Sequence, residues 1–151
     1  MEEERETVNI YLELCHAEAK MPCYARRGDA GMDVYAVEDT LVKPGQTVVV
    51  RTGLKVALPL GYELQIRPRS GLSLQTPLRV ANSPGTIDAG YRDELGIIMH
   101  NTSLEKGCQI KKGERVAQLV LQKVPQIHWI TVSSVREIGK DRGGGFGSTG
   151  E

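Results

Sequence analysis

Aromatic side chains are scarce in this sequence. They account for 5% of its 151 residues, with one Trp and one Phe, whereas hydrophobic residues as a whole account for 40%. A chain of this length folds as a single domain and can bury a substantial core. Because so few aromatics are present, we expect the core to be built from aliphatic side chains.

The sequence also lacks an excess of charge of either sign. Lys and Arg together number 19, and Asp and Glu together also number 19. Proteins that hold a nucleic acid polymer carry a basic surface field. We therefore expect no nucleic acid polymer as a partner, and any anion must be bound locally. This balance favours a small ligand.

Signals for secretion and for membrane insertion are missing too. Residues 1–6 are acidic and lack the apolar core of a signal peptide, and no apolar run approaches transmembrane length. Cys15, Cys23 and Cys108 are odd in number and do not have the paired spacing of a zinc site. We interpret them as reduced, mostly buried thiols. The sequence thus predicts a cytoplasmic protein that does not enter a membrane.

Short segments with the periodicity of strands dominate the chain. Residues 8–14 and 62–67 alternate between apolar and polar side chains, which is typical of half-buried strands. Residues 115–123 are almost continuously apolar, which predicts a strand buried on both faces. Shorter β segments are expected at 34–37, 47–50, 54–57, 108–110 and 127–132.

One segment has the signals of a helix. Residues 70–76 have Ser70 as a candidate N-cap, and Pro77 stops the helix after two turns. Many short strands separated by Gly and Pro turns predict an all-β fold, a jelly-roll-like sandwich or barrel with at most one short helix. We assign residues 1–138 to this domain and the Gly-rich residues 139–151 to a flexible C-terminal lid.

The largest group of reactive side chains lies in residues 82–101. β segments are expected on both sides of a turn in which Gly90 takes a positive φ, so that the two strands fold back on each other as a hairpin. Asp88, Tyr91 and Arg92 then lie at the bend. Asp88 is a candidate for catalysis, but an Asp in a tight turn usually bonds its own backbone.

An anion site is expected at the start of the helix candidate. Arg67 and Arg69 carry guanidinium groups, and Ser70 adds a hydroxyl beside the free N–H groups of the first turn. Gly71 lets a ligand approach the backbone. The alternative is an ordinary N-cap with arginines that face solvent.

Polar side chains elsewhere leave two interpretations open. Gln118 lies in an otherwise apolar segment, and a buried amide bonds either to backbone, which is the default, or to a ligand oxygen. Asp29 and Asp33 are expected in a loop, where Asp33 is able to serve a hydrated Mg²⁺. In the tail, Arg142 and Phe146 offer a phosphate fork and a stacking face, as in a lid. A Gly-rich terminus is nevertheless more often disordered than functional.

Five stretches taken together resemble the deoxyuridine triphosphatase (dUTPase) family. They span nearly the whole chain and read Ala-Gly-Met-Asp (30–33), Pro-Arg-Ser-Gly-Leu (68–72), Gly-Thr-Ile-Asp-Ala-Gly-Tyr-Arg (85–92), Arg-Val-Ala-Gln-Leu (115–119), and residues 142–150, which end in Gly-Phe-Gly-Ser-Thr-Gly. The resemblance implies a jelly-roll subunit of a homotrimer with three active sites at subunit interfaces. It also implies Mg²⁺-dependent hydrolysis of dUTP to dUMP and pyrophosphate, which keeps uracil out of DNA and supplies dUMP for dTMP synthesis.

The resemblance also implies a role for each matching residue. Asp88 would activate the water that attacks the α-phosphorus, Tyr91 would pack on the deoxyribose, and Asp33 would reach the metal through water. The base would be read by Asn82 and by the backbone around Gly85, Thr86, Ile87 and Ile98. The phosphates would be held by Arg69, Ser70, Gly71 and Gln118. In the tail, Phe146 would stack on uracil, and the γ-phosphate would be covered by Arg142, Gly147 and Ser148.

The chain departs from the family pattern at three places. Gly90 stands where the family often has a second acidic residue, and Asp93 stands where it commonly has Gly. Arg142 precedes Phe146 by four positions rather than the usual five, so Lys140 is an alternative to Arg142 for the phosphate contact.

Two competing hypotheses remain at this stage. One is a dCTP deaminase, which has a related fold but needs a Glu positioned to activate water at the base. The other is a noncatalytic nucleotide-sensing protein on the same scaffold. The retention of Asp88, Ser70 and Tyr91 argues against the second.

Overall fold

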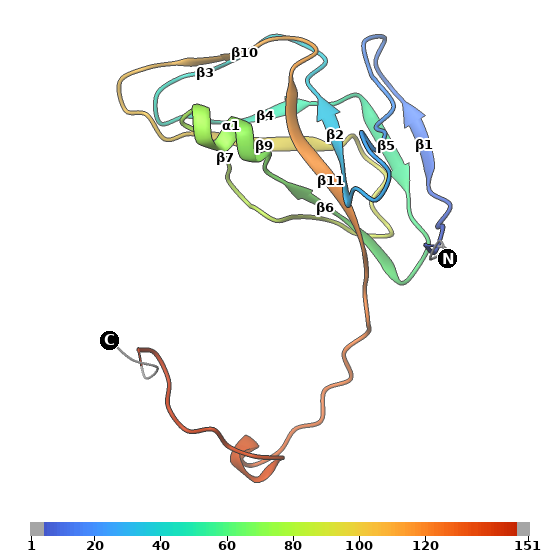
Figure 1. The fold of residues 1–151 in the computed structure, drawn as a ribbon, viewed down its shortest axis with the longest axis vertical. Coiled ribbons are helices and arrows are strands. Elements are labelled where there is room, and N and C mark those ends of the chain that lie inside the picture. The colour runs from blue at the N-terminus through green and yellow to red at the C-terminus, as the bar shows by residue number, and fades with distance from the viewer. Residues whose placement is uncertain (1–4, 148–151) are drawn as a thin grey trace.

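Strands account for almost all the regular structure in the computed structural model, which describes residues 5–147 (Figure 1). One α-helix, α1, and one 3-10 turn, η1, complete the elements of the described residues, which confirms the predicted all-β class with a single short helix. The elements are β1 Tyr11–Leu14, β2 Gly31–Tyr35, β3 Thr40–Val42, β4 Thr47–Arg51, β5 Leu54–Ala57, β6 Tyr62–Arg67, α1 Ser70–Gln75, β7 Leu78–Val80, β8 Gly85–Ile87, β9 Gly96–Asn101, β10 Cys108–Ile110, β11 Arg115–Lys123 and η1 Val135–Glu137.

The strands pair antiparallel in four sheets. The largest has the order β2-β11-β6-β8, the next has the order β4-β9-β7, and two further pairs are β1-β5 and β3-β10. Aliphatic side chains fill the space between them, as predicted from the scarcity of aromatics. The largest fully buried ones are Leu54, Leu78, Leu95, Ile97, Met99 and Ile110.

Strand β11 lies inside its sheet, between β2 and β6. Four of its residues are buried, which confirms the prediction of a strand covered on both faces. Gln118 lies opposite Asp33 of β2 and opposite Arg67 of β6. Because paired residues project from the same face of a sheet, these three polar side chains are neighbours.

The predicted hairpin is wrong. Strand β8 pairs with β6, whereas β9 pairs with β4 and β7, so the two strands belong to different sheets. The residues between them, 88–95, form a loop that connects the two sheets, and Gly90 does not take a positive φ. The backbone N–H of Leu95 bonds to the carbonyl of Leu54 instead of returning to β8.

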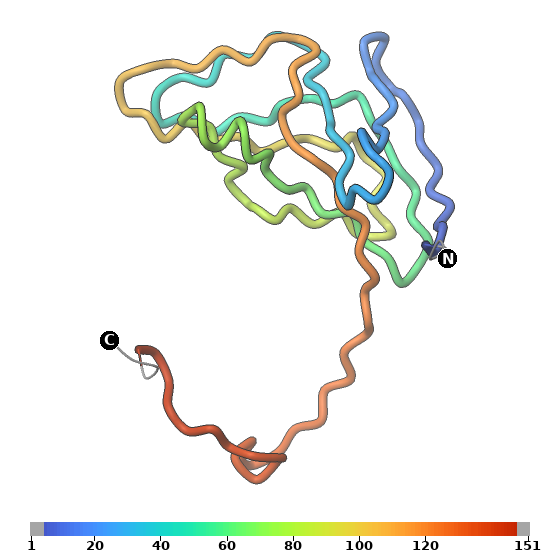
Figure 2. Tube along the Cα trace, in the orientation of Figure 1, coloured from blue at the N-terminus to red at the C-terminus, as the bar shows by residue number. Residues whose placement is uncertain are grey.

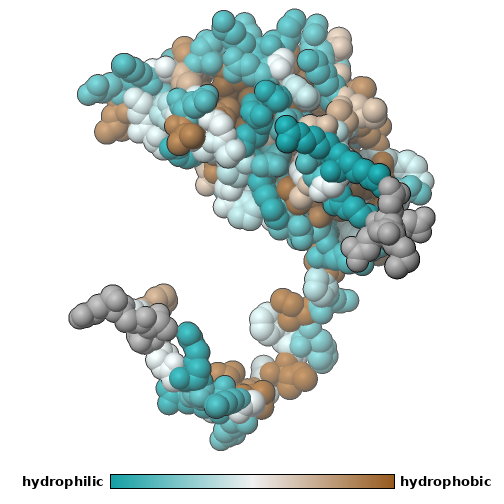
Figure 3. All heavy atoms as spheres, viewed as in Figure 1, coloured by the Kyte–Doolittle hydropathy of each residue, from teal (hydrophilic) through white to brown (hydrophobic). Residues whose placement is uncertain are grey.

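The predicted strand at 127–132 is also wrong. After β11 the chain runs away from the β body as an arm (Figure 2), so within residues 5–147 no strand lies beside it to accept its hydrogen bonds. Apolar side chains follow one another along this arm (Figure 3), and Trp129 and Ile130 are 81% and 77% exposed. The domain boundary placed after residue 138 stays a prediction.

Smaller expectations need correction as well. Asp33 lies in β2 rather than in a loop, and β1 begins at Tyr11 because residues 8–10 have no strand partner. Helix α1 has Arg69, not Ser70, as its N-cap, without a capping side-chain bond. The thiols are free, but Cys23 is exposed and the other two are half-buried. Among the described residues, no helix is long and apolar enough to cross a membrane.

Candidate functional site

A cluster of ion pairs lies where β2, β11 and the start of α1 meet. The Asp33 carboxylate accepts a hydrogen bond from Nε of Arg69 at 2.9 Å and lies 3.7 Å from a terminal nitrogen of Arg115. The side chains of Asp33 and Arg69 are each about a quarter exposed. Since Asp33 binds Arg69 through Nε, the terminal guanidinium nitrogens of Arg69 remain as donors for an anion.

Gln118 lies beside this cluster and supports the chain around it. Its amide nitrogen donates to the carbonyl of Pro68 at 3.0 Å, so the structural bond expected by default is present. Its amide oxygen covers Gly31, where an added Cβ would lie 2.2 Å from it. A larger residue at that position of β2 would force the Gln118 amide to move. A pocket of about 280 Å³ opens here, lined by Ala25, Asp29, Ala30, Gly31, Asp33 and Gln118.

The remaining residues of the expected anion site differ in their availability. Arg67 donates through two nitrogens to the side-chain oxygen of Gln65, at 3.0 and 2.8 Å, so those donors are occupied. Ser70 and Gly71 are exposed, and an added Cβ on Gly71 would meet nothing within 4 Å. Packing within one chain therefore does not require a glycine at position 71.

The acidic groups of this region do not form a metal cage. Within residues 5–147 no group of three or more His, Cys, Asp or Glu side chains is placed to hold an ion. Asp33 is the one carboxylate expected to serve Mg²⁺, and both of its oxygens face guanidinium groups. Within one chain, the described residues therefore do not form a cage for a metal ion.

The loop 88–95 presents a carboxylate that is available to a ligand. Asp88 is exposed, and its carboxylate accepts no hydrogen bond from any of the described residues. The backbone carbonyl of Asp88 accepts the N–H of Tyr91 at 3.1 Å, which closes the turn. The alternative in which the Asp88 side chain merely bonds its own turn is thus not what the structure contains.

Two further side chains stabilise this loop. Tyr91, 38% exposed, donates its hydroxyl to the backbone carbonyl of Glu94 at 2.9 Å. Arg92 folds back and donates to the carbonyls of Ala89 and Tyr91, at 2.6 and 2.9 Å. Arg92 therefore stabilises the turn through two hydrogen bonds to its backbone.

Most of the residues expected to read a base lie in β8 or just before it. Strand β8 is the last strand of its sheet, so one row of its backbone groups is unpaired. Asn82 is exposed at its start, and Gly85 packs so closely that an added Cβ would lie 3.2 Å from Cβ of Ile66. Thr86 is exposed, Ile87 is buried, and Ile98 is partly exposed on β9, which belongs to the other sheet. The Ile87 side chain thus belongs to the core, which leaves only its backbone available to a ligand.

One chain does not bring Asp88 and Arg69 together. Ile87 lies opposite Leu64 near the beginning of β6, whereas Arg69 follows the end of that strand. At the strand rise of ~3.3 Å per residue, the path of five residue steps from Leu64 to Arg69 spans about 16 Å. The carboxylate and the anion cluster therefore lie at opposite ends of β6.

The tail lies apart from both groups. Arg142, Phe146 and Gly147 are exposed, while Ser148 lies outside the described residues. In Figure 1 the chain after η1, drawn in red, lies far from the β body. Neither Lys140 nor Arg142 contacts the clusters above, so the choice between them stays open.

Sequence reasoning missed Arg51, Glu94 and Arg115 as parts of these groups. Arg115 pairs with Asp33. It lies three positions before Gln118, the residue opposite Asp33, and this proximity is visible only in the register of β2 with β11. Arg51 and Glu94 form an ion pair with a distance of 3.0 Å across 43 positions of sequence. No local pattern signals a contact of that range.

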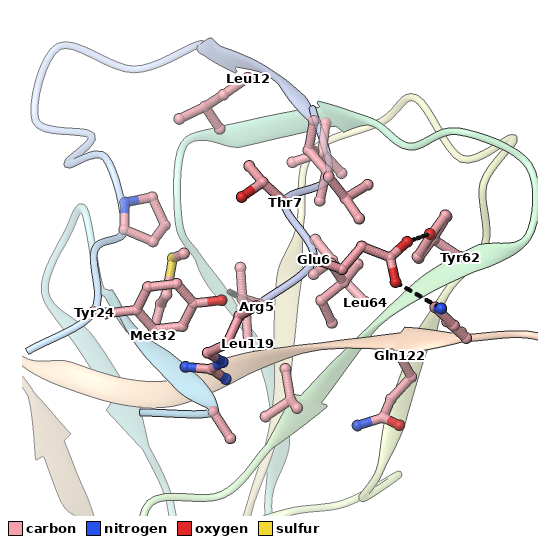
Figure 4. Close-up of a pocket in the computed structure, with 18 of the residues that line it drawn as sticks. Arg5, Glu6, Thr7, Leu12, Tyr24, Met32, Tyr62, Leu64, Leu119 and Gln122 are labelled. Carbon is pink, nitrogen blue, oxygen red and sulfur yellow. Dashed lines mark hydrogen bonds and ion pairs between the residues drawn. The ribbon is translucent and has the colours of Figure 1, made fainter. Parts of the chain in front are cut away.

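A larger pocket of about 760 Å³ lies between the N-terminal segment and strands β6 and β11 (Figure 4). Glu6 accepts the Tyr62 hydroxyl at 2.5 Å and lies 2.6 Å from Nζ of Lys123. The bond from Lys123, followed by that from Tyr62, lowers the pKa of Glu6. None of the residues expected to bind substrate lines this pocket.

Comparison with known proteins gives a consistent result. A family model described as dUTPase matches residues 17–150. The deoxyuridine 5'-triphosphate nucleotidohydrolase of Clostridium tetani is 44% identical over 142 residues, which cover 94% of this chain and 97% of the relative. The protein of that name from Mycobacterium leprae (strain TN) is 46% identical over 134 residues, which cover 86% and 87%.

Solved structures agree with the sequence relatives. The dUTPase of Staphylococcus bacteriophage 80alpha with bound dUpNHpp has a TM-score of 0.86 and 28% identity, and the match covers 96% of this chain and 100% of that one. A mutant dUTPase from phage phi11 of S. aureus, described with a structural Mg(II) ion, has a TM-score of 0.78 and 26% identity over 85% and 99% of the two chains. With four of its five stretches placed on the β body and a family match that spans most of its length, the chain belongs to the dUTPase family.

Proposed function

We propose that this protein is a dUTP diphosphatase that hydrolyses dUTP to dUMP and pyrophosphate, with water attacking the α-phosphorus. The observation that carries the proposal is the Asp88 carboxylate, which is exposed and accepts no hydrogen bond from the described residues although it lies in a tightly bonded turn. Such a carboxylate is able to take a proton from water. The names of the relatives and the dUpNHpp bound by the phage 80alpha enzyme support dUTP as the substrate.

The phosphate chain is bound by the cluster around α1 in this proposal. Arg69 is oriented by Asp33 and keeps terminal donors for phosphate oxygens, and Ser70 and Gly71 expose a hydroxyl and backbone beside it. Gln118 adds an amide. A Mg²⁺ chelated by the phosphates supplies charge neutralisation, and Asp33 reaches it through water.

In this proposal the nucleoside is bound by β8 and the loop 88–95. Backbone groups at the free edge of β8, with Asn82 and Ile98 beside them, read uracil, and the Tyr91 ring packs against the deoxyribose. A ring in that place leaves no room for a 2′-hydroxyl, so UTP is disfavoured. Hydrolysis by such an enzyme keeps uracil out of DNA and supplies dUMP, and we expect it to take place in the cytoplasm.

More than one chain is needed to build the complete site. Asp88 and Arg69 lie at opposite ends of β6, and the path from Leu64, which lies opposite Ile87, to Arg69 spans about 16 Å at the strand rise of ~3.3 Å per residue. This is too far for them to hold one α-phosphate in the same chain. We therefore place the sites at the interfaces of a homotrimer, where the nucleoside group of one subunit faces the phosphate group of another. The exposed apolar side chains of the arm support such an assembly.

Replacing Asp88 tests the reaction directly. Asp88→Asn keeps the shape of the side chain and removes the base, so turnover of dUTP is expected to fall by at least roughly a hundredfold while dUTP binding persists. The matched control is Asp93→Asn, which removes an exposed carboxylate from the same loop. Steady-state kinetics and calorimetric binding of a nonhydrolysable analogue measure the two effects.

The products of the assay decide among the competing hypotheses. Release of pyrophosphate from dUTP supports the proposal, whereas release of ammonia from dCTP identifies a deaminase instead. Binding without turnover identifies a nucleotide-sensing protein. Near-normal hydrolysis by Asp88→Asn contradicts the role given to that carboxylate.

A further inference from the structure

The loop that carries Asp88 and Tyr91 is anchored at its far end, at Glu94. Arg51, the last residue of β4, donates to both carboxylate oxygens of Glu94, from Nε at 3.1 Å and from a terminal nitrogen at 3.0 Å. Paired guanidinium–carboxylate bonds of this kind define the orientation of both side chains. Glu94 is consequently held in one place relative to the β4–β9–β7 sheet.

Additional bonds hold Glu94 and Leu95 from other directions. The Cys15 thiol donates to the Glu94 carboxylate at 3.4 Å. Thr52 donates its hydroxyl to the carbonyl of Leu95 at 2.6 Å. The short link between β4 and β5 and the residue after β1 thus hold this end of the loop in place; we call these contacts the seat of the loop.

The seat is connected to the substrate side of the loop through one hydrogen bond. The Tyr91 hydroxyl donates to the backbone carbonyl of Glu94 at 2.9 Å. A Tyr side chain has two rotatable bonds, so a tether at its hydroxyl determines where its ring lies. The position of the Glu94 carbonyl therefore sets the position of the Tyr91 ring.

We infer that Arg51 and Glu94 are positioning residues for sugar specificity. By clamping the Glu94 side chain, Arg51 fixes the carbonyl that holds the Tyr91 hydroxyl, and thereby holds the ring at the distance from the sugar that excludes a 2′-hydroxyl. This inference rests on the proposed function, since it assigns Arg51 and Glu94 a part in how the site distinguishes dUTP from UTP.

A purely structural role for the pair predicts a different outcome. Arg51 is 44% exposed in its side chain and also lies 3.7 Å from Glu38, and exposed ion pairs contribute little to stability. If the pair served only the fold, its loss would affect dUTP and UTP hydrolysis equally. A change in the ratio between the two substrates is the signature of positioning.

The first experiment compares kcat/KM for dUTP and for UTP in the full-length protein. Arg51→Ala and Glu94→Gln are each expected to lower the dUTP-to-UTP ratio by about three- to tenfold, the size of the loss of one well-placed hydrogen bond. Arg51→Lys keeps the charge without the fork and is expected to lower the ratio by a smaller factor. Glu38→Gln is the matched control, because it removes the other carboxylate beside Arg51 and leaves the clamp intact.

A second experiment tests whether the effect passes through the Tyr91 hydroxyl. In the Tyr91→Phe background that hydroxyl is absent, so adding Arg51→Ala is expected to leave the ratio as Tyr91→Phe alone has it. Additive effects of the two changes would overturn the inference. An unchanged ratio in Glu94→Gln or in Arg51→Lys, measured at a temperature at which each variant is folded, would overturn it as well.

These outcomes remain separate from the fate of the proposed function. If the unaltered protein does not hydrolyse dUTP, the proposed function fails before any variant is compared. If it hydrolyses dUTP with the expected preference over UTP, and the folded clamp variants keep that preference, the inference fails while the proposed function stands.

Discussion

The positions of several side chains in this protein are determined by contacts with residues far away in sequence. Glu94 was not a candidate from its sequence context, yet it gathers bonds from Arg51 and Cys15, which lie 43 and 79 positions away. Gln118 was singled out because an amide in an apolar strand needs a partner, and its partner is the Pro68 carbonyl, 50 positions away. The need for a partner is visible in the sequence, whereas the partner itself is not.

Acid should weaken the protein through Glu94. The bond from Arg51 is the largest cause that lowers the pKa of Glu94 below its ordinary value of 4.5, and the bond from Cys15 acts in the same direction. A carboxyl whose pKa is lower in the folded state stabilises the fold above its unfolded pKa and loses that contribution as the pH falls through its folded pKa. The melting temperature of the unaltered protein should therefore exceed that of Glu94→Gln at pH 7, and the gap should close at pH values below 4.5.

The pH comparison has an internal reference. Glu38→Gln also removes a carboxylate that faces Arg51, but one without bonds to the loop 88–95. A gap between the unaltered protein and Glu94→Gln that is the same at every pH would show that ionisation of Glu94 does not contribute to stability.

At the scale of elements, each strand was predictable where its own residues decide it. Strands β6 and β11 begin and end where the alternation and the apolar run predicted, at Tyr62–Arg67 and Arg115–Lys123. Strands β8 and β9 were expected in the right region but paired wrongly, because the choice of partner is made by other strands. The arm after β11 has the apolar content of a strand and no partner within the described part of its own chain.

The tail is expected to act as an element separate from the fold. Truncation after Gly139 should leave the melting temperature without nucleotide unchanged, because in the structure the tail lies far from the β body (Figure 1). Hydrolysis of dUTP should fall by orders of magnitude, since stacking of Phe146 on a base is worth roughly 1–3 kcal/mol and closure excludes water.

Single substitutions in the tail refine that test. Arg142→Ala and Lys140→Ala compare the two candidates for the phosphate contact, and the more damaging change identifies the residue that makes it. Full activity of the truncated protein would mean that the tail is a disordered end rather than a lid.

The whole molecule is expected to be a trimer. In one chain the nucleoside and phosphate groups are separated along β6, and large apolar side chains of the arm, including Trp129 and Ile130, are exposed. The separated groups cannot form one site in an isolated subunit, and the exposed apolar side chains are unfavourable in water. Packing of the arm on a neighbouring copy would explain both features.

Mass and fluorescence measure this assembly independently. Light scattering should give three times the chain mass of 16.6 kDa. Because Trp129 is the single Trp, its emission reports on the arm, and it should shift to shorter wavelength in the assembly than in the unfolded chain. Truncation after Pro125 should reduce the number of chains in the assembly, measured by light scattering, and the rate of dUTP hydrolysis. A fully active monomer would contradict a site shared between chains.

The sequence by itself determined the class of fold, the aliphatic core, the position of most strands and the set of residues that mark the dUTPase family. These properties depend on local periodicity, on composition and on short motifs, all of which are contained within segments of a few residues. The tertiary structure alone decided that β8 and β9 belong to different sheets, that Asp33 pairs with Arg69 and Arg115, that the Asp88 carboxylate is left free, and that Arg51 holds Glu94. Those contacts join positions far apart in the chain, and they form only when the right strands pair in the right register. Strand pairing is determined by burial of the whole core and not by the preference of any one segment.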